Sequence, residues 1–283
     1  MVSKGDFHCH STASDGVLSP TELIKLAYDQ GVRVMALTDH DSTEGIAEAR
    51  QAVPSGLTLI PGVEMGTDIP GSEVHMLGLY LEPDNPELQG ILGKLRDGRL
   101  GRGEGIVKKL REMELNISWE QVQRIAGDAA VGRPHIATAL VENGQVATVK
   151  EAFEKYIARD GPAYVERDKM TPVEAVETIV RMGGIPCIAH PRDLGNLDDV
   201  LVELKAAGMV GMEVYYKDYA PNEVERLRQL SEKHDLLALG GSDYHGLHGP
   251  DEPLPGGQHT PVPEESIQAL LALGRERTAG PAG

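Results

Sequence analysis

The sequence has only two cysteines, Cys9 and Cys187, among its 283 residues. That number excludes a disulfide framework, and their spacing excludes a zinc site made of paired thiolates, so we expect a reducing compartment. No run of about 18 apolar residues is present, and the first residues, MVSKGDFHCH, lack the apolar stretch of a signal peptide. We therefore expect a cytoplasmic protein without a membrane segment.

Positive charge is also scarce: 27 Lys and Arg stand against 44 Asp and Glu, which gives a formal net charge of -17. Such an acidic surface excludes broad, non-specific adhesion to nucleic acid or to anionic membranes. Residues 94–111 depart from this balance, because seven basic and two acidic residues give a local charge of +5. This segment is either a solvated helix face or an anion-binding region. Arg99 and Arg102 would share a helix face, although nearby glycines weaken the prediction of a helix.

Strand-like and helix-like runs alternate along most of the chain, and the seven strand-like runs predict an α/β fold with a mainly parallel sheet or barrel. The first helix is expected to begin at Ser19, as its cap, and Pro20. Between residues 86 and 180 the alternation gives way to consecutive helices. We expect a barrel formed by 1–85 and 181–275, a helical insertion over its mouth at 86–180, and a flexible tail at 276–283.

Two histidines separated by one residue, His8 and His10, end the first strand-like run. In an extended strand their side chains project to the same side while Cys9 faces away, as in half of a metal site. A strand end with two polar residues near solvent is the alternative. The rest of the chain favours metal, because other strand-like runs end in ligand-type residues as well: Asp39 and His40, Glu64, His190, and Asp243 with His245.

The carboxyl ends of strands in a parallel barrel converge on one face, so these distant residues are expected to meet there. Their charges would be unpaired unless a cation neutralised them. His75 lies near the start of its run, which indicates that this strand runs the opposite way or bends. Imidazole and carboxylate ligands without thiolate suit catalytic manganese, zinc or iron. Asp15, five positions after His10, is a further candidate. With one bridging carboxylate, these ligand-type residues suffice for two or three ions, which can hold a hydroxide nucleophile and clamp phosphoryl oxygens.

The motifs HCHSTASDG, LTDHD, CIAHP and GSDYH, with PGVEMG and EVHMLG between them, resemble those of the polymerase and histidinol phosphatase (PHP) domain family. The resemblance covers residues 5–250. It implies a distorted (β/α)7 barrel with a trinuclear metal centre in which every ligand position is filled. By this resemblance the first ion is held by His8, His10, Glu64 and Asp243, the second by Glu64, His75 and His190, and the third by Asp15, His40 and His245.

The segments GRPHIATALVENG and FEKYIARDGPAYV are similar to the stand-alone branch of that family that includes 3′,5′-nucleoside bisphosphate phosphatase and 5′-end exoribonucleases. Arg133 and His135 are then expected to contact substrate phosphate, with His135 as the candidate general acid. The alternative for GRPH is a plain helix start. Arg192 is a third candidate, although its counterpart in the family usually lies one residue later. Arg99 and Arg102 are the further candidates for substrate binding.

We interpret the sequence as a phosphoesterase that hydrolyses nucleotide monoesters through a metal-bridging hydroxide, most simply a nucleoside 3′,5′-bisphosphate, with the 5′ end of short single-stranded RNA as a second substrate. Two to three divalent ions, manganese before zinc or iron, are the expected cofactors. No membrane or obligate protein partner is expected. The alternatives are histidinol-phosphate phosphatase, a metal amidohydrolase, and a non-catalytic metal-binding accessory module.

Overall fold

Seven strands form one sheet whose spatial order follows the sequence. The structure is a computed structural model that describes residues 3–70, 72–127, 129–166, 170–247 and 252–278. In it the strands are β1 Gly5–Asp6, β2 Val34–Leu37, β3 Thr58–Ile69, β4 Ser72–Leu79, β5 Ile185–Ile188, β6 Gly211–Tyr216 and β7 Leu237–Gly241.

All neighbouring strands are parallel except at β4, which runs antiparallel to both β3 and β5. The prediction that the strand of His75 runs the opposite way is therefore confirmed. Backbone hydrogen bonds join the two edges of the sheet: Phe7 donates to the Gly240 carbonyl at 3.1 Å, and Asp243 donates to the His8 carbonyl at 2.8 Å. The sheet thus closes into the distorted seven-stranded α/β barrel that the sequence predicts.

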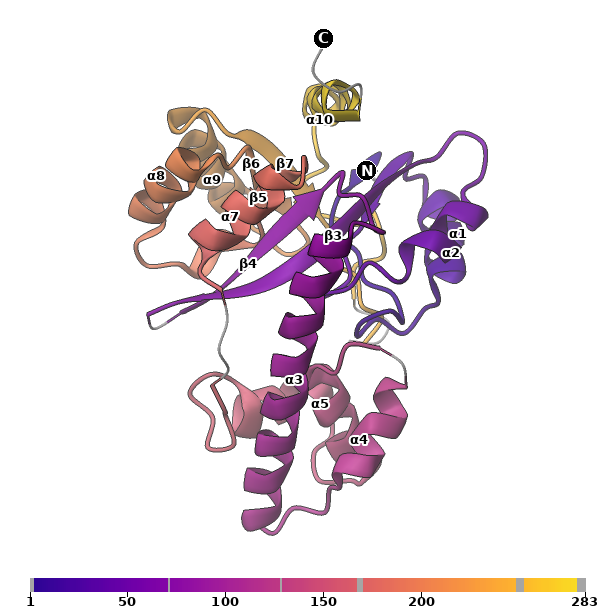
Figure 1. Cartoon of the computed structure of the whole chain (residues 1–283), viewed down its shortest axis with the longest axis vertical. Helices are drawn as coiled ribbons and strands as arrows, with labels where there is room; N and C mark the ends of the chain where they lie inside the picture. Colours follow the sequence, from indigo (N-terminus) through magenta and orange to yellow (C-terminus); the bar gives the residue numbers. More distant parts are fainter. Residues whose placement is uncertain (1–2, 71, 128, 167–169, 248–251, 279–283) are drawn as a thin grey trace.

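Helices cover the outside of the barrel (Figure 1). The first begins as expected, because the Ser19 side chain accepts a hydrogen bond from the Glu22 backbone, Glu22 reaches back to Ser19, and Pro20 occupies the first turn. These helices are α1 Pro20–Gln30, α2 Ile46–Ala52, α7 Pro172–Arg181, α8 Leu197–Ala207, α9 Pro221–Lys233 and α10 Glu264–Thr278, and the short 3-10 turn η2 Pro191–Asp193 follows β5.

A separate group of helices lies at one end of the barrel (Figure 1). It contains α3 Pro86–Glu112, α4 Trp119–Ala126, α5 Arg133–Glu142, α6 Val149–Ala152 and the π-helical turn η1 Phe153–Ile157. The long helix α3 joins it to the barrel: Leu88, Leu92 and Leu95 pack into the barrel core, whereas Ile106 and Leu110 pack into the core of the helical group. The glycines of residues 94–111 therefore do not interrupt the helix, because both halves bury apolar side chains.

Two regions differ in detail from the expected boundaries. α7 lies inside the range expected for the insertion, yet its buried Ala175, Val176 and Ile179 belong to the barrel core. The expected flexible tail begins at residue 276, but α10 continues to Thr278; residues 279–283 lie outside the described part of the chain. Among the described residues, no helix is both long and apolar enough to cross a membrane.

Two glycines of α3 test how the helical group is held together. A Cβ atom at Gly103 would lie 2.9 Å from the ring of Trp119, whereas one at exposed Gly90 would meet nothing within 4 Å. We expect Gly103→Ala to reduce the free energy of unfolding by about 1–3 kcal/mol through overpacking, and Gly90→Ala to raise it by up to about 1 kcal/mol through helix propensity. Urea unfolding followed by circular dichroism and by the fluorescence of the single tryptophan measures both. A Gly103→Ala variant as stable as the parent would contradict this packing.

Candidate metal centre

The nine predicted metal ligands lie together at the end of the barrel that the helical group covers. His8 and His10 follow β1, and both imidazoles are fully buried. The Nε2 atom of His8 lies 3.1 Å from Glu64 Oε2 and 3.3 Å from Asp243 Oδ1, and His10 Nε2 lies 3.1 Å from each of these oxygens. This is the first predicted ligand group, and Cys9 points away into a hydrophobic cluster, as the strand period requires.

The other ligand-type residues gather around Glu64 and Asp15. His75 Nδ1 lies 2.7 Å and His190 Nε2 3.1 Å from Glu64 Oε1, which brings the second predicted group together. In the third group, Asp15 lies 3.4 Å from His245 Nε2 and 3.9 Å from His40 Nε2. His40 Nδ1 also lies 3.0 Å from Glu64 Oε2. His40 therefore stands between the second and third groups, closer to the shared carboxylate than the sequence indicates.

The unpaired atoms of this cluster fit metal binding. Buried side-chain atoms without a hydrogen bond include His8 Nε2, both ring nitrogens of His10, His40 Nδ1, Glu64 Oε2 and Asp15 Oδ1. Buried polar atoms are normally satisfied, because leaving one unpaired costs about 1–3 kcal/mol. The residues that carry these atoms form groups in which one ligand atom of each residue lies within 4.8 Å of the others. The donors are imidazoles and carboxylates, the set that suits a catalytic divalent ion.

The electrostatics of the cluster favour a bound cation. Burial alone would raise the pKa of the Glu64 carboxyl, but the imidazoles of His40, His8 and His75 hold that pKa well below its usual value. Burial lowers the pKa of His40 to about 4, which keeps its ring neutral and able to bind metal. Burial acts in the same direction on His10, yet its contacts with Asp243 and Glu64 raise the pKa of His10 to about 9. Ionised carboxylates thus attract either protons or metal ions, and binding of the metal displaces the protons.

Several residues that sequence reasoning missed hold the ligands in place. Glu213, fully buried within β6, lies with both carboxylate oxygens 3.2 Å from His8 Nδ1 and accepts a 2.8 Å hydrogen bond from the His190 backbone. Tyr216 donates a 2.6 Å hydrogen bond to Asp243 Oδ2, and Lys217 lies 3.0 Å from the same atom. The other oxygen of Asp243 is left to face the imidazoles. Outer partners of this kind fix the orientation of metal ligands.

Asp39 organises the loop between His10 and Asp15. The sequence places Asp39 at the end of a strand, but Asp39 belongs to none of the three predicted ligand groups. Its buried carboxylate accepts hydrogen bonds from the Ser11 backbone, the Ser11 hydroxyl and the Ser14 hydroxyl, at 2.6–2.8 Å. Backbone strain occurs nearby, since His190 and Asp243 have φ values of 29° and 46°. Non-glycine residues rarely adopt positive φ, and such strain concentrates at functional sites.

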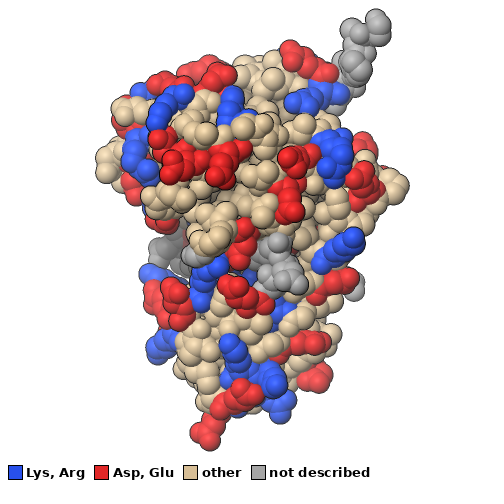
Figure 2. Space-filling view, turned by 60° about the vertical axis from the view of Figure 1, so that its left-hand side comes forward, with Lys and Arg blue, Asp and Glu red and all other residues tan. Residues whose placement is uncertain are grey.

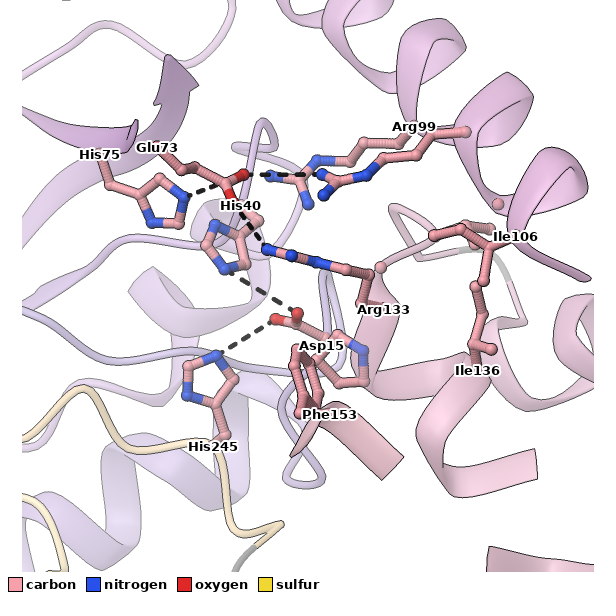
Figure 3. Close-up of a pocket in the computed structure, with 15 residues that line it drawn as sticks. Asp15, His40, Glu73, His75, Arg99, Ile106, Arg133, Ile136, Phe153 and His245 are labelled. Atoms are coloured by element: carbon pink, nitrogen blue, oxygen red, sulfur yellow. Dashed lines mark hydrogen bonds and ion pairs between the residues drawn. The ribbon is translucent and has the colours of Figure 1, made fainter. Parts of the chain in front are cut away.

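A pocket beside the cluster joins the barrel to the helical group (Figure 3). Asp15, His40, His75 and His245 form its barrel side, and the predicted Arg99, Arg102 and Arg133 form its helical side. Arg99 pairs with Asp41 at 2.5 Å. Glu73, near the start of β4, lies 2.7 Å from Arg133 and 3.6 Å from Arg102.

Arg102 is the least satisfied of the three arginines. Its side chain is only 7% exposed, and its Nε and Nη2 atoms have no hydrogen-bond partner. Arg102 lines the pocket, and a guanidinium with unsatisfied donors is suited to an anion with several oxygens. The predicted helix start at GRPH and the predicted role of Arg133 are both compatible with the structure, since α5 begins at Arg133 and this side chain lines the pocket.

The structure does not bring His135 or Arg192 to the wall of this pocket. His135 accepts a 3.0 Å hydrogen bond from the Gly132 backbone at the start of α5, and burial lowers the pKa of its ring. Arg192 packs over the Tyr219 ring and lies within 3.6 Å of the carboxylates of Asp218 and Glu223. The catalytic roles of His135 and Arg192 therefore stay predictions.

The barrel, the histidine and carboxylate cluster and the neighbouring arginine pocket define a metal-dependent hydrolase that acts on phosphate esters. The family model described as the PHP domain matches residues 6–166, more than half of the chain. The chain belongs to the PHP domain family, as the sequence motifs indicate.

Relatives support the same assignment. The chain is 37% identical to a 5′-3′ exoribonuclease of Haemophilus influenzae over 87% of this chain and 91% of that protein. It is 33% identical to the 3′,5′-nucleoside bisphosphate phosphatase of Chromobacterium violaceum over 85% of this chain and 86% of that protein. A solved structure assigned as a metal-dependent phosphoesterase, from Bifidobacterium adolescentis, superimposes with a TM-score of 0.87 at 30% identity, covering 97% of this chain and 98% of the other. This chain is an enzyme, a metal-dependent phosphoesterase.

Glu64 is the carboxylate that touches the most imidazoles in the cluster, so its charge tests the metal centre directly. We expect Glu64→Gln to lose at least one metal ion per chain, because an amide of the same size lacks the charge that holds two cations together. Phosphatase turnover should fall by at least about 100-fold, since outer partners of ligands alone contribute about 10- to 100-fold. Elemental analysis after manganese reconstitution measures the metal, with Glu177→Gln on the outside of α7 as the control. Normal metal content with normal turnover would rule out this role.

Glu213 allows a second test that separates positioning from ligation. Glu213→Gln keeps the size of the side chain but removes the charge next to His8, so we expect metal affinity to fall by about 10- to 100-fold. Competition with a chelator measures the affinity, and Glu203→Gln, on the exposed face of α8, is the matched control. The thermal unfolding temperature of the metal-free Glu213→Gln variant should stay close to that of the metal-free parent. A variant with unaltered metal affinity would show that Glu213 does not position the ligand.

Proposed function

We propose that this phosphoesterase hydrolyses nucleoside 3′,5′-bisphosphates and, as a second activity, acts on the 5′ ends of short RNA. The observation that carries the proposal is Arg102, whose buried guanidinium lies in the same pocket as four of the candidate metal ligands. Its Nε and Nη2 atoms have no hydrogen-bond partner, and only its Nη1 atom lies near a carboxylate, 3.6 Å from Glu73. A substrate with two phosphates fits this arrangement: the 3′-phosphate lies at the ligand cluster and the 5′-phosphate in the arginine pocket. The names of the two relatives, a bisphosphate phosphatase and an exoribonuclease, are consistent with such substrates.

The reaction adds water across the bond between phosphorus and the 3′-oxygen. The oxygen of water bonds to phosphorus, and the departing 3′-oxygen takes up a proton. Two or three divalent ions, manganese by preference, would be held by the nine residues described above and would supply an activated water and charge neutralisation. Arg99, Arg102 and Arg133 would bind and orient the second phosphate, and so fix the reacting phosphate in line for attack.

The arginine pocket also bears on the alternatives. Histidinol phosphate carries one phosphate and a cationic amine, so it would offer no second phosphate to the unsatisfied donors of Arg102. Figure 2 shows acidic and basic side chains interspersed over the face of the molecule that it draws, without a continuous basic surface. We therefore propose a small or short substrate rather than a long polyanion. The free and buried state of Cys9 and Cys187 is compatible with the expected cytoplasmic location.

A substrate panel tests the proposed function. The manganese-loaded enzyme is assayed for release of inorganic phosphate from adenosine 3′,5′-bisphosphate, histidinol phosphate and p-nitrophenyl phosphate. Release of ammonia from amide substrates is measured in parallel, because a solved structure with a TM-score of 0.86 and 31% identity is described as an amidohydrolase from Chromobacterium violaceum. A preference for histidinol phosphate over the bisphosphate would overturn the proposal.

Arg133 provides the corresponding variant. We expect Arg133→Ala to reduce kcat/KM for adenosine 3′,5′-bisphosphate roughly tenfold to over a hundredfold, which corresponds to lost charge-assisted hydrogen bonds of about 1.5–3 kcal/mol. The loss should be smaller for p-nitrophenyl phosphate, which lacks the second anion, and metal content should not change. Arg124→Ala, at an exposed site on α4, serves as control. Equal losses on both substrates would place Arg133 at the reacting phosphate instead.

A further inference from the structure

A second groove opens onto the metal cluster from another side. It has a volume of 330 Å³ and is lined by Pro134, Val149, Lys150, Phe153, Lys217, Asp243, His245 and Leu247. Pro134, Phe153 and His245 also line the arginine pocket, so the two cavities meet at these residues. Because Asp243 and His245 are candidate metal ligands, a phosphate at the cluster could extend into either cavity.

Phe153 stands between the two cavities. It is one of two phenylalanines in the chain, and the other, Phe7, is completely buried in the barrel core. Phe153 begins the π-helical turn η1, and the Arg133 guanidinium lies over its ring at 5.6 Å. Turns of π-helix within α-helices frequently occur at functional sites. A partly exposed aromatic ring at the junction offers a surface on which a nucleobase can stack.

The second groove combines positive charge with apolar surface. Lys150, on α6, is 78% exposed and lies 3.7 Å from Glu154, and Lys217 lies against the Asp243 carboxylate. Val149, Pro134 and Leu247 provide the apolar part of the lining. Two lysines next to an aromatic ring, in a chain with a net charge of -17, match the phosphate and base of a nucleotide better than an uncharged ligand.

The bonds at the scissile phosphorus of RNA indicate which part of the substrate would occupy the groove. In a 3′-phosphate monoester only one oxygen on phosphorus is esterified, so the arginine pocket alone accommodates the nucleotide. In RNA the same phosphorus also carries the 5′-oxygen of the next nucleotide, which must leave the cluster in a second direction. When water attacks this phosphorus, the 3′-oxygen departs with a proton, and the 5′-oxygen of the next nucleotide stays bonded to phosphorus.

From these observations we propose that the groove between Phe153, Lys150 and Lys217 binds the nucleotide on the 3′ side of the scissile phosphate in short single-stranded RNA. This inference rests on the proposed function and assigns a binding site to its second activity, the cleavage of short RNA. The first nucleotide occupies the arginine pocket, and the remaining strand leaves through the lysine-lined groove.

Lys150 tests the proposal without touching a candidate ligand. We compare Lys150→Ala and Lys150→Glu on adenosine 3′,5′-bisphosphate and on a 5′-phosphorylated tetraribonucleotide. Each Lys150 variant should leave kcat/KM for the bisphosphate within twofold of the parent. For the tetranucleotide we expect a graded loss, about three- to tenfold for alanine and more for glutamate, and a smaller dependence of affinity on salt. Lys155→Ala and Lys155→Glu are matched controls, because Lys155 is exposed, pairs with Glu151 and lines neither cavity.

The outcomes separate this inference from the proposed function. Equal losses on both substrates, or no loss on the tetranucleotide, would overturn the groove as a binding site. A parent enzyme that hydrolyses the bisphosphate, but is neither able to cleave the tetranucleotide nor inhibited by it, would overturn the groove and the second activity on RNA while leaving the proposed bisphosphate hydrolysis intact. A parent enzyme inactive on both substrates, but active on p-nitrophenyl phosphate, would overturn both.

Discussion

The buried carboxylate of Glu64 is the contact on which the site depends. Its two oxygens lie within 3.1 Å of nitrogen atoms from His8, His10, His40, His75 and His190. These imidazoles come from the ends of β1, β2 and β5 and from within β4, so they can meet only if the sheet closes and β4 runs the opposite way. Because an ionised carboxylate is costly to bury alone, barrel closure and cation binding stabilise each other.

The ligands could be predicted from the sequence because each belongs to a local pattern. His8 and His10 follow the two-residue period of a strand, and the other ligands end apolar runs or follow them closely, apart from His75. Glu213 does not belong to such a pattern, because it lies in the middle of β6 rather than at its end. All residues of β6 are buried. The irregular register between Glu213 and Tyr215 arises from pairing with β7, which a local sequence pattern does not indicate. An acidic residue in a fully buried strand is itself a sign of function, and it could have been noticed.

The substrate-binding residues were harder to predict from the sequence, because their positions depend on how the helical group packs against the barrel. Arg99, Arg102 and Arg133 were predicted from charge and from a motif, and they do line one pocket. Arg192 lies two residues after a candidate ligand in the sequence, but its guanidinium lies beside the carboxylates of Asp218 and Glu223 and does not line this pocket. Glu73 was not predicted, because its position between His75, Arg102 and Arg133 arises from the way α3 and α5 pack against β4, which no local pattern indicates.

The acidic character of the chain and its proposed anionic substrate are compatible because the positive charge is confined. The arginines of α3 and α5 project into a cavity whose opposite wall carries the candidate metal ligands, so they act over a few ångströms, within the screening length of physiological salt. The remaining acidic surface repels long polyanions. Glu73 adds to this selection by pairing with two of the arginines, because a ligand must displace or share a carboxylate to reach them. A substrate with a compact, doubly charged phosphate competes for those guanidinium groups more effectively than a singly charged diester.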